Sequence, residues 1–125
     1  MSPDPGARPA ASVQIFGVRK SAATRAALRF FAERRVAVHF VDLNERAASL
    51  GELRRFAQRF GVAALVDPEA RRYRELGLAA ARLSEERWLE KLTVEPLLLR
   101  MPLVRRGNDL TVGPADPEWR TWVGR

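Results

Sequence analysis

The sequence predicts an α/β fold in which helices flank a mixed four-stranded sheet and a helical insert separates the second strand from the third. Two short apolar runs, 12–17 and 36–43, enclose a segment with apolar residues at helical spacing, and a connection of that length fits a parallel strand–helix–strand unit. The segment 103–113 consists of two short runs around Gly107-Asn108-Asp109, which predicts an antiparallel hairpin. A parallel pair and a hairpin together make a mixed sheet.

The first strand, SVQIFG, ends in a glycine, and the helix after it should run from Ser21 to about Arg34. Ser21 is a suitable N-cap, and the apolar positions of this helix fall on one face. These positions are Ala23, Ala27, Phe30 and Phe31. The second strand, VAVHFVDL, is apolar on both faces, which is typical of a central strand in a covered sheet.

The insert between the second and third strands should consist of helices. Ser49 and Glu52 have the spacing of a capping box, and Gly61 stands where a helix that begins there would end. The segment 71–78 predicts one short helix, and Ser84, which two glutamates follow, should begin another.

A closing helix is expected from Asp116 to the end of the chain, with Trp119 and Trp122 as core residues. Pro102 stands just before the first hairpin strand, where its missing N–H group costs no ladder hydrogen bond. This order of elements is that of the thioredoxin-like architecture, in which Pro102 would be a cis-proline facing the N-terminus of the first helix. We therefore expect one domain over residues 12–125, preceded by a flexible tail at residues 1–11.

The composition excludes several kinds of chemistry. The 125-residue chain has no cysteine, so disulfides, zinc–thiolate sites and a cysteine nucleophile are impossible in it. It has one histidine, His39, which argues against a multi-histidine metal centre, and we expect neither a metal nor a cofactor. No apolar run reaches the ~18 to 20 residues that span a bilayer, and the first ten residues lack the apolar stretch of a secretory signal. We therefore expect a cytoplasmic protein with no membrane contact.

The formal net charge is +7, a balance that attracts anions in general. The arginine-rich stretches around 54–59 and 71–74 are either solvated surface or a docking surface for an acidic protein. The sequence contains no recognised nucleic-acid-binding module, so we expect no direct contact with DNA or RNA.

Several blocks resemble the ArsC/Spx family, which comprises glutaredoxin-coupled arsenate reductases, Spx-type regulators that bind RNA polymerase, and their relatives. The resemblance extends over roughly residues 12–124 and implies a thioredoxin-like fold. The blocks occur in the family's order, and they are IFGVRKSAATRAALRFFAERRVAVHFVDL (15–43), YRELGL (73–78), LSEERWLEKLTVEPLLLRMPLV (83–104) and LTVGPADPEW (110–119).

The departures from the family pattern bear on function. By the resemblance, Ser21 stands at the position of the family's catalytic cysteine, and Thr24 at the second cysteine position of Spx-type members. The arginines that hold arsenate in the reductases match Asp67, Met101 and Gly113 here. A serine cannot perform thiol redox chemistry, because the helix dipole supplies at most ~2 kcal/mol and a hydroxyl offers no disulfide.

Two interpretations of the start of the first helix remain open. Ser21 could act only as an N-cap, or it could belong to an anion pocket that would hold phosphate, sulfate or a carboxylate of a glutathione-like peptide. Ser21 as a hydrolytic nucleophile is disfavoured, because His39 would have to be its base and lies in the middle of a strand. The hypothetical pocket residues are Arg19, Lys20, Ser21, Thr24, Arg25, Arg100 and Pro102.

We thus expect a member of the ArsC/Spx family that has no catalytic residue, has lost thiol redox catalysis and binds a protein in a regulatory role. The transcription machinery is a partner that the resemblance implies. The alternative is a binder of, or an enzyme for, a small anion or glutathione-like ligand that uses the pocket at the start of the helix.

Overall fold

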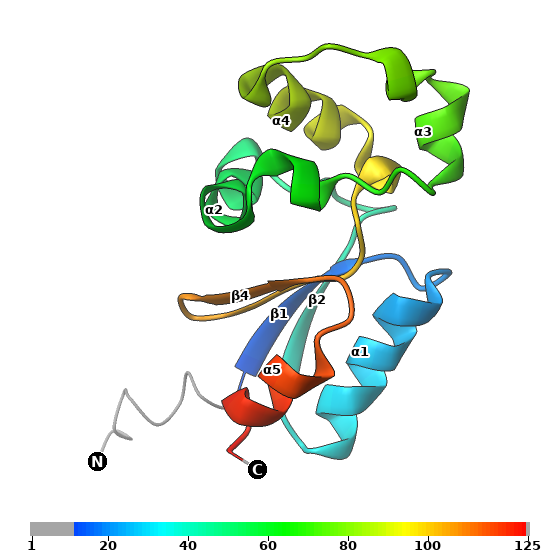
Figure 1. The fold of residues 1–125 in the computed structure, drawn as a ribbon. Helices are drawn as coiled ribbons and strands as arrows, with labels where there is room; N and C mark the ends of the chain where they lie inside the picture. Colours follow the sequence, from blue (N-terminus) through cyan, green and yellow to red (C-terminus); the bar gives the residue numbers. More distant parts are fainter. Residues whose placement is uncertain (1–11, 125) are drawn as a thin grey trace. The chain divides into compact units, whose positions relative to one another are not determined.

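The computed structural model describes residues 12–124, and the chain divides into two compact units (Figure 1). The first unit comprises the residues up to Asp42 together with those from Met101 onward, and the second unit is Leu43–Arg100. The tail expected at residues 1–11 lies outside the described residues. That residues 12–125 act as a single domain stays a prediction.

The first unit contains a four-stranded sheet. Its strands are β1 (Ser12–Gly17), β2 (Ala37–Asp42), β3 (Leu103–Arg106) and β4 (Asp109–Val112), in the spatial order β2-β1-β3-β4. β1 runs parallel to β2 and antiparallel to β3, and β3 and β4 form the expected antiparallel hairpin. The mixed four-stranded sheet is confirmed.

The position of β2 differs from the expectation, because it is an edge strand and not a central one. Val41 is buried, whereas the rest of the strand is exposed or half-buried. Val38 and Phe40 pack against the core from one face, and His39 is exposed. An apolar sequence on both faces therefore does not place a strand inside a sheet, since the order of strands depends on contacts distant in sequence.

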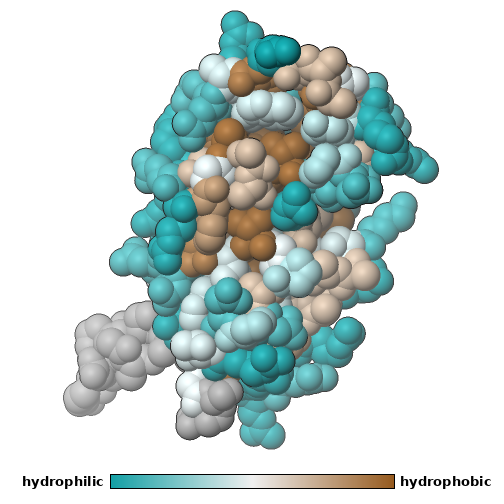
Figure 2. All heavy atoms as spheres, in the orientation of Figure 1, coloured by the Kyte–Doolittle hydropathy of each residue, from teal (hydrophilic) through white to brown (hydrophobic). Residues whose placement is uncertain are grey.

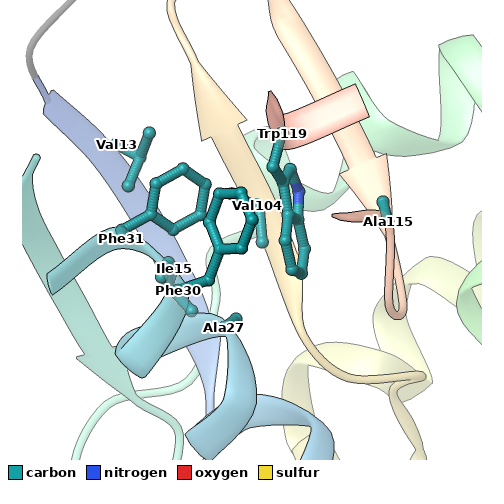
Figure 3. Packing of buried hydrophobic residues seen from close by; sticks show 8 residues of the cluster. All are labelled: Val13, Ile15, Ala27, Phe30, Phe31, Val104, Ala115 and Trp119. Carbon is teal, nitrogen blue, oxygen red and sulfur yellow. The ribbon is translucent and has the colours of Figure 1, made fainter. Parts of the chain in front are cut away.

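Helices α1 (Ala22–Glu33) and α5 (Asp116–Trp122) pack on one face of this sheet. Phe30, Phe31 and Trp119 meet there, with the two phenylalanine rings 5.0 Å apart and each 5.5 Å from the tryptophan ring (Figure 3). The indole Nε1 of Trp119 donates a hydrogen bond of 2.8 Å to Thr111 Oγ1, so its polar atom is satisfied inside the core. The other core residues are Val13, Ile15, Ala27, Val104 and Ala115.

The second unit is helical, as expected for the insert between β2 and β3. Its elements are α2 (Leu50–Phe60), η2 (Val62–Leu65), α3 (Arg71–Glu75), η3 (Leu78–Ala80), α4 (Glu85–Val94) and η4 (Pro96–Leu98). The helix expected at 71–78 is shorter, because Gly77 adopts a left-handed conformation (φ 64°) and ends it. Val66 and Leu99 form an isolated antiparallel bridge in this unit.

Polar contacts at helix ends stabilise the second unit. The capping box is present at the start of α2: Glu52 N donates to Ser49 Oγ (3.1 Å), and Ser49 N donates to Glu52 Oε1 (2.8 Å). Burial alone would raise the pKa of Glu52, but hydrogen bonds from Arg46 and Ser49 outweigh it and hold that pKa below its usual value. Ser84 caps α4 in the same way, by accepting from Arg87 N at 3.1 Å.

Within residues 12–124, none of the helices has the length and apolar character needed to cross a membrane. Figure 2 shows hydrophilic residues along the edges of the face in view, with hydrophobic residues between them.

Candidate functional site at the start of helix α1

The start of α1 is positioned by the end of β1. After Gly17 the chain makes a short turn in which Ser21 N donates to Val18 O (3.0 Å). Ser21 has extended backbone angles (φ −76°, ψ 122°), and its Oγ accepts a hydrogen bond from Thr24 N at 3.1 Å. Ser21 is therefore the N-cap of α1, which confirms the expected helix start. Its side chain is half-buried.

Pro102 lies at the same end of the sheet as the start of α1. The Met101–Pro102 peptide bond is cis, as expected. Phe16 pairs with Leu103 in the antiparallel register of β1 and β3, so the next position along each strand brings Pro102 level with Gly17, from which the chain leads to Ser21. Pro102 is buried, and its carbonyl oxygen accepts a hydrogen bond of 2.8 Å from Gly113 N.

Thr24 is fully buried against the end of β1. A Cβ atom at Gly17 would lie 2.3 Å from Thr24 Oγ1, so the glycine provides the space that the threonine fills. Thr24 Oγ1 has no hydrogen-bond partner among the described residues. Of the two hydroxyls expected to line an anion pocket, the one of Ser21 therefore reaches the surface, and the one of Thr24 does not.

Three basic residues surround the helix start, and all are exposed. The guanidinium carbon of Arg19 lies 4.7 Å from the centre of the Phe40 ring, which is a cation–π contact. Arg25 Nη1 donates to Arg19 O at 2.7 Å, so the Arg25 side chain reaches back to the turn that precedes α1. Lys20 directly precedes Ser21. The structure thus groups Arg19, Lys20, Ser21 and Arg25 around the first turn of the helix.

Arg100 belongs to the second unit, and its side chain contacts carbonyl oxygens of that unit. Its Nε donates to Ala64 O and its Nη2 to Val66 O, both at 3.2 Å, and its backbone N donates to Leu65 O at 2.8 Å. The guanidinium therefore holds the end of η2 to the segment that leads into β3. Its assignment to an anion pocket rested on its place next to Met101 in the sequence, and the observed contacts are structural.

The chemistry available here is that of a helix N-terminus. The first N–H groups of a helix have no carbonyl partner within it, and the helix dipole favours negative charge at this end.

A serine nucleophile would need a base. His39 pairs with Gln14 in the sheet register. Gln14 lies three residues before Gly17, which corresponds to about 10 Å along β1. Among residues 12–124, no three histidine, aspartate or glutamate side chains gather in a way that could hold a metal ion.

Two contacts of this region were not expected from the sequence. The fit of Thr24 against Gly17 could have been suspected, since a glycine inside a strand often marks a close approach. The contacts of Arg100 to carbonyl oxygens had no local signal, because Ala64 and Val66 lie more than thirty residues away in sequence.

Comparisons with known proteins agree with the resemblance seen in the sequence. The chain resembles a YffB protein (TM-score 0.82, 20% identity, covering 90% of this chain and 99% of that chain). It also resembles an arsenate reductase from Vibrio cholerae (TM-score 0.75, 24% identity, 86% and 93%). These likenesses show the thioredoxin-like fold.

No protein with a curated description matches the sequence. A family model, by contrast, matches residues 16–122 and thus most of the chain, and its description is "ArsC family". With this match and the shared fold, the chain belongs to the ArsC family.

Proposed function

We propose that this protein is a redox-inactive member of the ArsC family that acts by binding another protein. One observation carries the proposal. Ser21 caps α1 at the position where, by resemblance, the reductases of the family have their catalytic cysteine, and the chain contains no cysteine.

The physical argument concerns the acidity of the residue at this position. In a reductase, the helix N-terminus lowers the pKa of a thiol and stabilises the thiolate. A helix end contributes at most ~2 kcal/mol, which is far too little to ionise a serine hydroxyl at neutral pH. The Ser21 Oγ also accepts the Thr24 N–H group, which gives this hydroxyl a structural role as the N-cap of α1.

The surroundings of Ser21 support binding in place of catalysis. The resemblance matches Met101, beside the cis-proline, to an arginine that holds arsenate in the reductases. Met101 is half-buried here, and it offers an apolar surface where an oxyanion would need charge. Exposed Arg19, Lys20 and Arg25 lie at the nearby helix start. Such a surface suits a protein segment with apolar and acidic side chains, and the family suggests a component of the transcription machinery as one such partner.

An activity assay tests the first half of the proposal. With glutathione, glutaredoxin and arsenate, we expect no turnover above the blank. Ser21→Cys restores the thiol, and Ser21→Ala is its matched control. If the cysteine variant gains reductase activity, the scaffold has lost only the sulfur. If it stays inactive, the altered surroundings also prevent catalysis. Turnover by the wild-type protein would refute the proposal.

A cross-linking experiment tests the second half. We expect a photo-cross-linking amino acid in place of Arg25 to capture a defined protein from native lysate, because this residue lies at the first turn of α1. The same amino acid in place of Arg29, which is exposed further along α1, is the control. Binding of the purified partner must then weaken with Arg25→Glu. Equal capture at both positions would contradict a partner surface at the helix start.

A second candidate is a binder of small anions or glutathione-like ligands, which the grouping of three cationic side chains around Ser21 favours. Isothermal titration with arsenate, phosphate and glutathione distinguishes it from the first. If this candidate is correct, at least one of these ligands binds, and Arg25→Gln weakens that binding. Absence of heat at millimolar ligand would exclude it.

A further inference from the structure

A row of polar side chains crosses the sheet on the face opposite to α1. In the strand register, Gln14 of β1 pairs with His39 of β2 on one side and with Arg105 of β3 on the other. The three residues therefore stand level on adjacent strands, with about 10 Å between the outer two strands. Gln14 Nε2 lies 3.4 Å from His39 Nδ1, so two members of the row are in contact.

This part of the face is open to solvent. Further along the same face, Phe16, Val41 and Leu103 are almost completely buried, whereas His39 is exposed and Gln14 and Arg105 are half-buried. A depression of about 240 Å³ lies over the polar row. Its lining consists of Ser12, Val13, Gln14, His39, Arg105 and Gly107.

The polar groups around the depression are mainly hydrogen-bond donors. Arg105 uses Nε to donate to Gly107 O at 2.8 Å, which fixes its side chain and leaves the terminal nitrogens of the guanidinium for another acceptor. In the tautomer in which His39 Nδ1 accepts from Gln14 Nε2, the imidazole proton is on Nε2, which can then donate. Ser12 adds a hydroxyl group. No carboxylate is among the lining residues.

We propose that this row binds the oxyanion group of a ligand, a carboxylate or a phosphate, at a site separate from the start of α1. Arg105 would supply the charge and a forked pair of N–H donors, which match the oxygens of either group. His39 Nε2 would donate from β2, and the Ser12 hydroxyl would donate from β1. The depression is shallow, so the oxyanion would be the end of a larger molecule that continues into solvent.

The single histidine of the chain makes the test direct, because the imidazole signals in an NMR spectrum can come only from His39. Inorganic phosphate and acetate are titrated separately at constant ionic strength, with chloride as the reference, and the two arms distinguish phosphate from carboxylate. We expect a saturable shift of the His39 signals with at least one of the two. Arg105→Gln should weaken the binding at least tenfold.

Three further variants keep the test decisive. Arg29→Gln removes the same charge from the exposed surface of α1 and should leave the affinity unchanged. Arg105→Lys keeps the charge without the fork and should bind with intermediate affinity, even if Arg105→Gln does not fold. Ser21→Ala should have no effect, which separates this site from the helix start. The proposal is overturned if chloride moves the signals as much, or if Arg29→Gln and Arg105→Gln weaken the shift equally.

Discussion

Each of the two units has an apolar core of its own, but the polar contacts within the units differ. In the first unit, three aromatic rings and the aliphatic residues of β1 and β3 form a core around one buried hydrogen bond, from Trp119 to Thr111. The second unit also buries apolar side chains, among them Leu53, Phe56 and Leu92. Its short helices are joined in addition by ion pairs and backbone contacts, which include Arg72–Glu95 at 2.8 Å, Arg54–Glu86 at 2.8 Å and the carbonyl contacts of Arg100.

The difference indicates which unit should respond to which change. Burial of apolar area contributes about 25 cal/mol per Å² and does not depend on pH. Ion pairs between partly exposed groups are weaker, are screened by salt and disappear when the carboxylate is protonated. We therefore expect core substitutions to destabilise either unit, and acid and salt to weaken the second unit through the Arg72–Glu95 and Arg54–Glu86 pairs.

Trp119→Ala should have the largest effect. Trp119 is 1% exposed and contacts both phenylalanines, and removal of a buried aromatic side chain costs about 3–5 kcal/mol. Urea unfolding followed by circular dichroism measures the loss. Trp122→Ala, at a partly buried position, is the control and should cost clearly less. Equal losses would mean that the aromatic cluster does not dominate the stability of the first unit.

Gly17→Ala should also destabilise the first unit, by about 1–3 kcal/mol as for other overpacked sites. The new Cβ would lie 2.3 Å from Thr24 Oγ1, so α1 and β1 would have to move apart. Thr24→Ala in the same protein should recover much of the loss, because it removes the clashing atom. If the double variant is no more stable than Gly17→Ala alone, the strain lies elsewhere.

Glu95→Gln should weaken the second unit in a pH-dependent way. Hydrogen bonds from Arg72 hold the pKa of Glu95 below its usual value of 4.5. A lowered pKa means that the carboxylate stabilises the folded state above pH 4.5, and that this contribution is lost as the pH falls through the folded-state pKa.

The wild-type protein should thus have a larger free energy of unfolding than Glu95→Gln at neutral pH, and this difference should vanish in acid. Urea unfolding measures it. Glu90→Gln on the exposed side of α4 removes the same charge and should show no such dependence. A constant difference from neutral to acidic pH would contradict the role of the Arg72 contact.

The Arg54–Glu86 pair should contribute least. Both side chains are about half exposed, and such pairs contribute about 0.2–1 kcal/mol. A double-mutant cycle with Arg54→Ala and Glu86→Ala at low and high salt measures the coupling. The coupling should shrink with added salt. A salt-independent value would indicate that the pair is more shielded than its exposure implies.

Much of the fold follows from local sequence signals. Ser21, Ser49 and Ser84 cap helices as their positions indicated, and the hairpin and the cis bond before Pro102 are present. The helix caps and the hairpin are decided by a few neighbouring residues, which is why the sequence can reveal them. The cis bond was expected from the architecture that the order of elements predicts.

The features that the sequence did not reveal concern contacts between distant residues. The edge position of β2 depends on which strands pair with β1, and the role of Arg100 depends on carbonyl groups of another segment. The burial of Thr24 likewise depends on Gly17 in another element. That these residues form a ligand site stays a prediction.

The contacts of Arg100 also bear on how relatives of this protein should be compared. Its side chain reaches two carbonyl oxygens at once through separate nitrogens of one planar group, which a single ammonium at the end of a flexible chain does not reproduce. At this position the shape of the side chain matters more than its charge. A substitution table that treats arginine and lysine as equivalent would overlook the constraint.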